Sequence, residues 1–240
     1  MANPILHIKN LSKRFGGVIA VDHMSFEISK GSLTAIIGPN GCGKSTLFNL
    51  ICGAEQADKG DILFNGDVIS KMPAENICKL GIGRKFQNPS VFEEMTVLEN
   101  LRLPALRISD APASHDMLNL IDLTERADDL AGNLSHGEKQ WLEIAMVLMQ
   151  RPNLLLLDEP TAGMTVAETS KTAQLIQKLN KEDGITILVI EHDVRFIELL
   201  NCPVMVLANG EILKSGNFEE ISNDYEVREL YFGRREASYA

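Results

Sequence analysis

The sequence predicts an α/β fold built around a parallel sheet, and four stretches carry that prediction. Residues 33–37 are apolar and partly β-branched, and a glycine-rich loop separates them from residues 47–51, where apolar side chains recur at helical spacing. This pattern is typical of a buried strand that turns into a helix. Residues 154–157 and 185–190 are apolar without interruption, as are strands that are covered on both faces in a parallel sheet.

The regions on either side of this core predict antiparallel strands. Residues 6–11 alternate between apolar and polar side chains, and residues 21–28 predict a second strand. Two Asn-Gly pairs, at 65–66 and 209–210, each separate two short apolar runs, which is the pattern of a β-hairpin. Residues 81–87 predict one more strand.

From about residue 96 to residue 150 the chain has the pattern of several helices and no strong strand signal. Thr96 with Glu99 three residues later predicts a capped helix start. This block is a candidate helical subdomain, at approximately residues 88–150, inserted into the α/β core. Helices are further predicted over residues 165–179 and 218–232.

Composition argues against several kinds of protein. A net charge of −10 over 240 residues gives no general attraction to nucleic acid or to anionic lipid. The four cysteines have neither metal-site nor disulfide-framework spacing, so a reducing cytosol is the simplest compartment. Residues 1–15 lack the apolar segment of a signal peptide, and the longest apolar runs are too short to cross a bilayer. Any membrane role is therefore expected to need a partner.

The loop after the first buried strand has the composition of a phosphate-binding loop. Its residues are Gly38, Pro39, Asn40, Gly41, Cys42, Gly43, Lys44, Ser45 and Thr46. The glycines let backbone N–H groups point into one concave nest, and the following helix N-terminus adds positive potential. Lys44 is expected to reach the β- and γ-phosphates of a nucleotide, and the Ser45 hydroxyl to ligate Mg²⁺. The alternative is a glycine turn with a chance lysine.

Two other predicted strands end in side chains suited to phosphate chemistry. Asp158 and Glu159 follow the first of them, and His192 follows the second. Ligands bind beyond the carboxyl ends of parallel strands, so we expect these three residues at one edge of the sheet. One of the two acids can serve Mg²⁺ through its waters while the other faces the γ-phosphate and the attacking water. For His192, a γ-phosphate role and a structural role are both open.

Two further stretches have features with more than one explanation. Phe15 is either a core aromatic residue or a ring on which a purine stacks. Ser135 and Glu138 fit a capping box, but that explanation leaves Gly137 in the first turn of the helix, at a cost of about 1 kcal/mol relative to alanine. A glycine there makes sense if a phosphate approaches the backbone at the helix N-terminus.

In their order along the chain, these stretches resemble the ATP-binding cassette (ABC) family, and the resemblance covers the chain to about residue 232. Residues 38–46 match the Walker A loop, 134–140 the signature loop and 154–158 the Walker B strand. The resemblance also assigns single residues: Gln87 to the glutamine that contacts Mg²⁺, Glu159 to the catalytic glutamate, His192 to the switch histidine, and Phe15 to the aromatic residue that stacks on adenine.

The resemblance implies a P-loop ATPase fold with a RecA-like core, an N-terminal antiparallel β subdomain and the inserted helical subdomain, all in one nucleotide-binding domain over residues 1–240. Two ATPase subunits, as a homodimer or a heterodimer, would sandwich two ATP molecules head to tail. Ser135 and Gly137 of one subunit would then reach the γ-phosphate bound to the other.

The resemblance also implies a mechanism. Glu159 would polarise the attacking water, while Lys44, His192 and Mg²⁺ would stabilise the developing charge. The family pattern implies that Ser45, Gln87 and Asp158 hold the metal.

Within the family, residues 84–87, 134–143 and 162–165 look like those of ATPase subunits of branched-chain amino-acid and urea importers. The urea or short-chain amide branch is the closer match, and a branched-chain amino-acid importer is the alternative. Either implies permease subunits docked near residues 87–94, a solute-binding protein that acts through them, and a location on the cytoplasmic face of the membrane.

Two other classes of protein fit less well. A soluble ABC ATPase of DNA repair, translation or iron–sulfur assembly often has two cassettes, long insertions or basic faces, none of which is evident here. A P-loop kinase would leave the signature loop and His192 unexplained. Three positions depart from the family pattern: His136 and Glu138 in the signature loop, and Met164 in the loop after Walker B.

Overall fold

The computed structural model describes residues 4–87, 90–106, 108 and 110–232. Its centre is a six-stranded sheet in the order β10-β9-β3-β8-β7-β6, in which every neighbouring pair is parallel except β10 with β9. The strands are β3 (Leu33–Ile37), β6 (Ile82–Lys85), β7 (Leu154–Asp158), β8 (Thr186–Ile190), β9 (Val204–Ala208) and β10 (Glu211–Gly216). Because β3, β7 and β8 are adjacent, their carboxyl ends meet at one edge.

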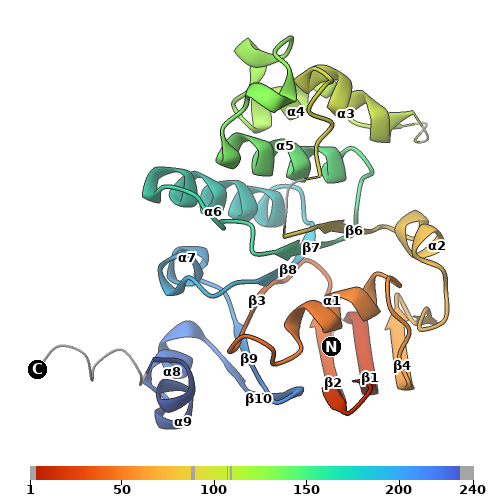
Figure 1. The fold of residues 1–240 in the computed structure, drawn as a ribbon, viewed down its shortest axis with the longest axis vertical. Helices are drawn as coiled ribbons and strands as arrows, with labels where there is room; N and C mark the ends of the chain where they lie inside the picture. Colours follow the sequence, from red (N-terminus) through yellow and green to blue (C-terminus); the bar gives the residue numbers. More distant parts are fainter. Residues whose placement is uncertain (1–3, 88–89, 107, 109, 233–240) are drawn as a thin grey trace, which may run out of the picture.

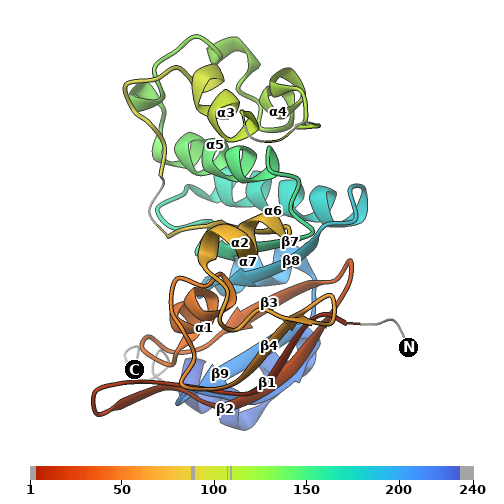
Figure 2. The same ribbon diagram turned by 90° about the vertical axis from the view of Figure 1, so that its right-hand side faces the viewer.

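A second sheet of four antiparallel strands, in the order β2-β1-β4-β5, lies beside helix α1 (Lys44–Ile51) (Figures 1 and 2). Its strands are β1 (Pro4–Phe15), β2 (Val18–Ser29), β4 (Lys59–Phe64) and β5 (Asp67–Val68). The predicted antiparallel N-terminal region is therefore confirmed, and so are both Asn-Gly hairpins, which join β4 to β5 and β9 to β10.

The helices are distributed unevenly along the molecule. Figure 1 shows α3, α4 and α5 gathered at one end, beyond α6, while α8 and α9 lie near the other end. The helices are α1 (Lys44–Ile51), α2 (Ala74–Lys79), α3 (Val97–Ala105), α4 (Ser114–Leu120), α5 (His136–Leu148), α6 (Val166–Lys181), α7 (Val194–Leu200), α8 (Phe218–Asn223) and α9 (Tyr225–Val227). Short helical turns are η1 (Thr124–Arg126), η2 (Ala131–Asn133) and η3 (Arg228–Phe232).

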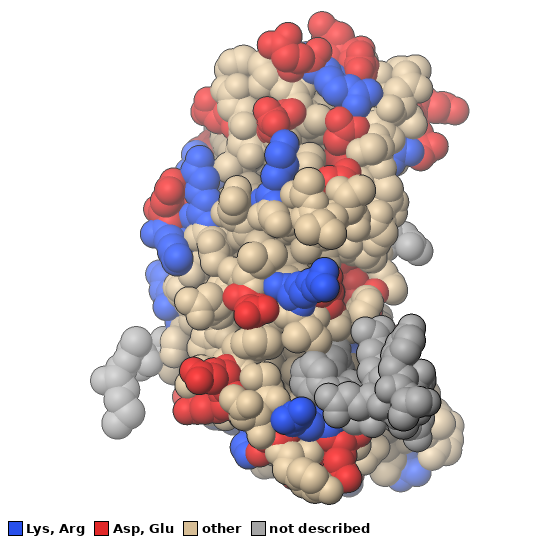
Figure 3. All heavy atoms as spheres, turned by 90° about the vertical axis from the view of Figure 1, so that its left-hand side faces the viewer, with Lys and Arg blue, Asp and Glu red and all other residues tan. Residues whose placement is uncertain are grey.

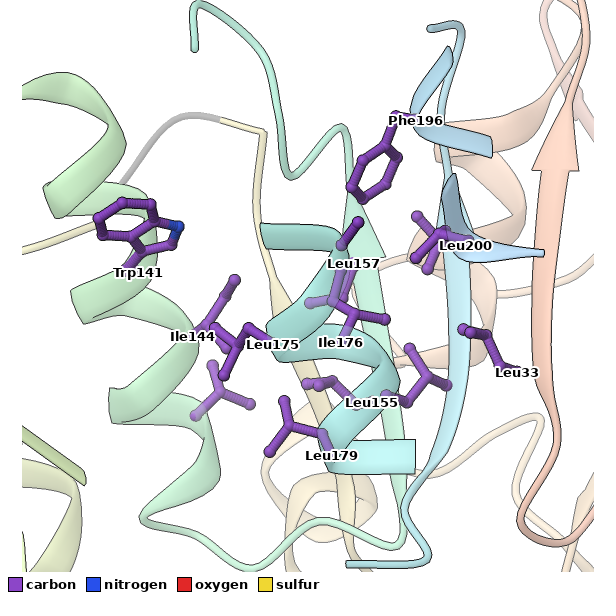
Figure 4. Packing of buried hydrophobic residues seen from close by; sticks show 14 of the residues in the cluster. Leu33, Trp141, Ile144, Leu155, Leu157, Leu175, Ile176, Leu179, Phe196 and Leu200 are labelled. Atoms are coloured by element: carbon purple, nitrogen blue, oxygen red, sulfur yellow. The ribbon is translucent and has the colours of Figure 1, made fainter. Parts of the chain in front are cut away.

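The core consists of two apolar clusters on opposite faces of the six-stranded sheet. Successive side chains of a strand point to opposite faces, and in β7 Leu155 and Leu157 belong to one cluster while Leu154 and Leu156 belong to the other. Figure 4 shows Leu155 and Leu157 packed among side chains of α5, α6 and α7. Burial on both faces explains why the sequence of this strand is apolar without interruption.

The helix starts agree with the predicted caps. Thr96 caps α3 and Ser135 caps α5, and in both cases the glutamate three residues later completes a capping box. Helix α2 has no counterpart in the sequence prediction. No helix among the residues that the structure describes is long and apolar enough to span a membrane.

Candidate nucleotide-binding site

The phosphate loop joins β3 to α1 through backbone geometry that needs glycine. Gly41 and Gly43 have φ values of 79° and 105°, in the region that side chains disfavour. A Cβ on Gly43 would lie 2.1 Å from the carbonyl oxygen of Ala20, and one on Gly38 would lie 2.3 Å from that of Leu207. The loop is therefore fixed against β2 and β9, with its N–H groups at the start of α1.

Lys44, the first residue of α1, folds back over this loop. Its ammonium group donates hydrogen bonds to the carbonyl oxygens of Gly38 at 2.8 Å and Pro39 at 2.9 Å, and the residue is buried. Cys42 is also buried, and burial raises the pKa of its thiol although nearby Lys44 opposes the shift. The lysine lies in the loop as predicted, and a phosphate would have to compete with these two carbonyl groups for its protons.

A cavity of about 900 Å³ opens over the loop. Gln87, Glu159 and His192, three residues that the sequence analysis singled out from distant stretches, line it together with the loop residues. The loop residues that line it are Gly38, Pro39, Asn40, Gly41, Gly43, Lys44, Ser45 and Thr46, and the remaining lining residues are Ala20, Val194 and Leu230.

Glu159 contacts both Gln87 and His192. The Gln87 amide donates to Glu159 Oε2 at 2.9 Å, and His192 Nδ1 lies 3.5 Å from Glu159 Oε1. Glu159 has a φ of 46°, an unusual conformation for a residue with a side chain, and such backbone strain is concentrated at functional sites. Its N–H donates to the carbonyl oxygen of Ile190, which keeps the ends of β7 and β8 together.

Asp158 has a different environment from its neighbour. It is buried, and its Oδ2 accepts a hydrogen bond from the guanidinium of Arg84 at 3.0 Å. Burial raises the pKa of Asp158, and the charge of Arg84 opposes that shift. Asp158 is not among the cavity-lining residues, whereas Ser45 and Gln87 are. A hydroxyl and an amide oxygen beside phosphates are the hard oxygen ligands that Mg²⁺ prefers, so the donor set fits this ion.

Phe15 does not line this cavity. Its ring is 45% exposed on the β1–β2 hairpin, with the Lys13 ammonium 5.0 Å from the ring centroid. The core-aromatic alternative is therefore wrong, while adenine stacking stays a prediction.

Ser135 and Gly137 do not line the cavity either. They lie at the start of α5, on the other side of α6 from the phosphate loop in Figures 1 and 2. Gly137 has a local neighbour, because a Cβ there would lie 2.4 Å from Glu168 Oε1. The absence of a side chain at position 137 thus makes room for Glu168 within the same chain.

The unusual residues of the signature loop have local partners. Glu138 accepts from the backbone N–H of Ser135 and forms an ion pair with Arg126 at 2.7 Å. Burial acts to raise the pKa of Glu138, but the hydrogen bond from Ser135 and the contacts with Arg126 together outweigh it, so the pKa is lowered. The His136 Nε2 atom lies 3.2 Å from the Gln140 amide. Both residues therefore stabilise the first turns of α5.

The sequence analysis missed the buried charges of Lys85, Glu143 and Glu191. Lys85 is fully buried and donates to the carbonyl oxygen of Phe86, and Glu143 and Glu191 are also buried. Burial lowers the pKa of Lys85 and raises that of Glu143 to about 7. A lysine directly after the apolar start of a predicted strand, and a glutamate on the apolar side of a helix, are the signals that could have found them.

Comparison with known proteins agrees with this geometry. Residues 21–162 match the family model described as ABC transporter, and the chain belongs to that family. It has the family's ATPase fold and is an ATPase.

The curated relatives narrow the type of transporter. The chain is 36% identical to the high-affinity branched-chain amino acid transport ATP-binding protein BraF of Pseudomonas aeruginosa, over 97% of this chain and 99% of BraF. It is 34% identical to LivG of Escherichia coli K12, which has the same descriptive name, with the same coverage. These names support the branched-chain amino-acid alternative of the sequence analysis, and they do not support urea as the cargo.

Solved structures are similar along nearly the whole chain. An ATP-binding cassette of an ABC transporter in its ADP conformation superimposes with a TM-score of 0.87 at 32% identity, over 97% of this chain and 100% of that one. A cassette solved as a dimer in a post-hydrolysis state, with ADP and Pi bound, gives a TM-score of 0.79 at 27% identity, over 89% and 98% of the two chains. The expected fold class is thereby confirmed.

Proposed function

We propose that the chain is the ATP-hydrolysing subunit of an importer for branched-chain amino acids. The observation that carries the proposal is that the phosphate loop lines the same cavity as Gln87, Glu159 and His192. The names of the relatives BraF and LivG supply the class of cargo. The chain is taken to act as one nucleotide-binding domain, in which α3, α4 and α5 form the inserted helical subdomain.

In the proposed reaction, ATP binds with its triphosphate on the N–H groups of the loop and the Lys44 ammonium. Glu159 accepts a proton from the attacking water, and His192 and Lys44 stabilise charge on the transferred phosphoryl group. Ser45 and Gln87 would hold Mg²⁺, with Asp158 behind them, and the ion would neutralise phosphate charge. The hydrogen bond from Gln87 to Glu159 at 2.9 Å orients the carboxylate for this role.

Two copies, or this chain and a second ATPase subunit, would enclose the nucleotide head to tail. In support of this arrangement, Ser135 and Gly137 lie away from the cavity of their own chain, and a similar cassette has been solved as a dimer. We place the start of α5 of one subunit over the phosphate loop of the other, where its N–H groups would meet the γ-phosphate.

The permease would dock beside the glutamine loop, at the cytoplasmic face of the membrane. A groove of about 360 Å³ there is lined by the half-exposed rings of Phe86 and Phe92 together with Leu103 and Met146; residues 88 and 89 of the predicted docking stretch lie outside the described residues. Two buried atoms of lining residues, Arg84 Nε and Glu143 Oε2, have no hydrogen-bond partner within the described part of the chain. A docked helix would therefore find a mainly apolar surface that includes the two phenylalanine rings.

The face drawn in Figure 3 carries lysine, arginine and acidic side chains side by side, with acidic groups gathered at the end formed by the helical region. Among the described residues on this face there is no continuous basic stripe. This distribution favours a protein partner over nucleic acid, in line with the net charge of −10.

The decisive experiment is reconstitution of the complex. The tagged chain is purified from membranes with its permease subunits, placed in vesicles with the solute-binding protein, and tested for ATP-dependent uptake of labelled leucine, isoleucine, valine and urea. We expect uptake of the three amino acids and its loss with Glu159→Gln. Uptake of urea alone would overturn the cargo but not the ATPase role, and isolation without any permease would overturn the transport role.

A further inference from the structure

Glu191 joins the ends of three strands beneath the proposed catalytic groups. It directly follows β8, is 1% exposed, and its backbone N–H donates to the carbonyl oxygen of Ile36 in β3 at 3.2 Å. It is not among the residues that line the nucleotide cavity. Its side chain therefore acts on neighbouring protein groups rather than on the nucleotide.

The carboxylate of Glu191 receives hydrogen bonds from two separate segments. Oε1 accepts from the Thr161 hydroxyl at 2.6 Å and from the Thr161 N–H at 3.0 Å. Oε2 accepts from the N–H of His192 at 3.1 Å and, more weakly, from that of Asp193 at 3.5 Å. One buried side chain thus connects the loop after β7 to the loop after β8.

The two connected segments carry the two groups proposed to act on the γ-phosphate. Thr161 is two residues after Glu159, and His192 is the next residue after Glu191. The two side chains approach within 3.5 Å, between Glu159 Oε1 and His192 Nδ1. The same ring nitrogen of the half-exposed His192 lies 3.9 Å from Glu191 Oε2. The Glu191 carboxylate thus links the backbone that follows Glu159 to the backbone that carries the His192 ring.

We propose that Glu191 is a positioning residue for ATP hydrolysis, which sets the distance between Glu159 and His192 by clamping Thr161 to the backbone of residues 192 and 193. This inference rests on the proposed function, because it assumes that Glu159 and His192 act on the same phosphoryl group. It adds a residue that neither the motifs nor the comparisons assign.

The chemistry of the clamp requires a carboxylate. All four hydrogen bonds are donated to Glu191, and only an ionised carboxylate can accept on both oxygens without presenting a donor of its own. A glutamine of the same size would place its NH₂ group against N–H or O–H donors on one side. An aspartate is one methylene shorter and cannot reach both segments from the same backbone position.

The test compares hydrolysis with binding in the purified chain. For Glu191→Gln, we expect kcat for ATP to fall by about 10- to 100-fold, while the Kd for Mg-ATP stays within about twofold, because the phosphate loop is untouched. Thr161→Val, which removes only the 2.6 Å hydrogen bond, should give a smaller loss of kcat. The double variant should lower kcat by a smaller factor than the product of the two single-variant factors, because both substitutions disrupt the same set of hydrogen bonds.

A matched control is available in Thr169→Val, the same substitution at a buried threonine of α6, which should leave kcat unchanged. A wild-type kcat in Glu191→Gln would overturn the inference. A loss of kcat that is matched by a loss of nucleotide affinity and by a lower Tm would also overturn it, because it would reflect general destabilisation of the fold. If Glu191→Gln does not fold, Thr161→Val alone must reduce kcat without weakening binding, and an unchanged kcat then overturns it. Active Glu159→Gln and His192→Ala variants would instead overturn the proposed function itself.

Discussion

The two walls of the nucleotide cavity are built in different ways. The phosphate-loop wall comes from the consecutive residues 38–46, of which all but Cys42 line the cavity, and its geometry is set by glycines and by the start of α1. The second wall comes from Gln87, Glu159 and His192, which lie on three loops after β6, β7 and β8. The first wall follows from local backbone conformation, whereas the second exists only when three parallel strands are in register.

This difference separates two tasks. A nest of backbone N–H groups binds phosphate by its shape and charge and needs few specific side chains. Activation of water depends on where a carboxylate and an imidazole stand relative to each other, and small displacements there cost much of the rate. We therefore expect changes in the phosphate-loop wall to act on nucleotide affinity, and changes in the assembled wall to act on turnover.

The largest expected effect is that of Glu159→Gln. Loss of the carboxylate removes the proposed base, so kcat should fall by about 10²- to 10⁴-fold, while the affinity for Mg-ATP stays near that of the wild type because the phosphate loop keeps its contacts. Steady-state hydrolysis together with equilibrium titration of ATP measures both quantities. If Glu159→Gln weakened ATP binding by the same factor as it lowered kcat, the two walls would not have separate roles.

A smaller effect of the opposite kind is expected from Lys44→Ala. Removal of the ammonium deletes a charged hydrogen bond to phosphate, a loss of about 1.5–3 kcal/mol, and ATP affinity should fall roughly 10- to 100-fold. The hydrogen bonds that Lys44 donates to Gly38 and Pro39 disappear as well, so unfolding in urea is measured in parallel. An ATP titration identical to that of the wild type would contradict the assigned geometry of the loop.

The same difference explains how far the sequence could predict the structure. Residues 38–46 are contiguous, and the capping boxes at Thr96 and Ser135 are complete within four residues, so local chemistry sufficed for both. The approach of Gln87 to Glu159 depends on the pairing of β6 with β7, which periodicity does not specify. Only the family resemblance pointed to Gln87 before the structure did.

The buried charges illustrate a second limit. Nothing in the local sequence indicates that Arg84 pairs with Asp158, or that Glu191 accepts hydrogen bonds from Thr161, because both contacts span strand pairs of the sheet. For Gly137, by contrast, the sequence suggested one explanation and the structure provides a second one. A phosphate in trans was the explanation suggested by the sequence, and the structure adds the Glu168 carboxylate, which lies close enough to require a glycine within one chain.

The smallest expected effect on nucleotide binding and turnover is that of Glu143, because its burial acts on the stability of the fold instead. Its Oε1 accepts from the N–H of Phe86 at 3.4 Å, next to Gln87, and burial raises its pKa to about 7 against the opposing charge of Lys85. The folded state therefore binds the proton more tightly than the unfolded state, and Glu143 should lower the free energy of unfolding progressively from about pH 4.5 to pH 7, by up to about 3 kcal/mol. Glu143→Gln keeps the acceptor but cannot ionise, so its stability relative to the wild type should rise over that range in urea-unfolding curves at pH 5 and pH 7.5. The exposed Glu226→Gln is the control, and equal pH dependence of the wild type and the Glu143 variant would place the charge of Glu143 in a more solvated environment than the fold indicates.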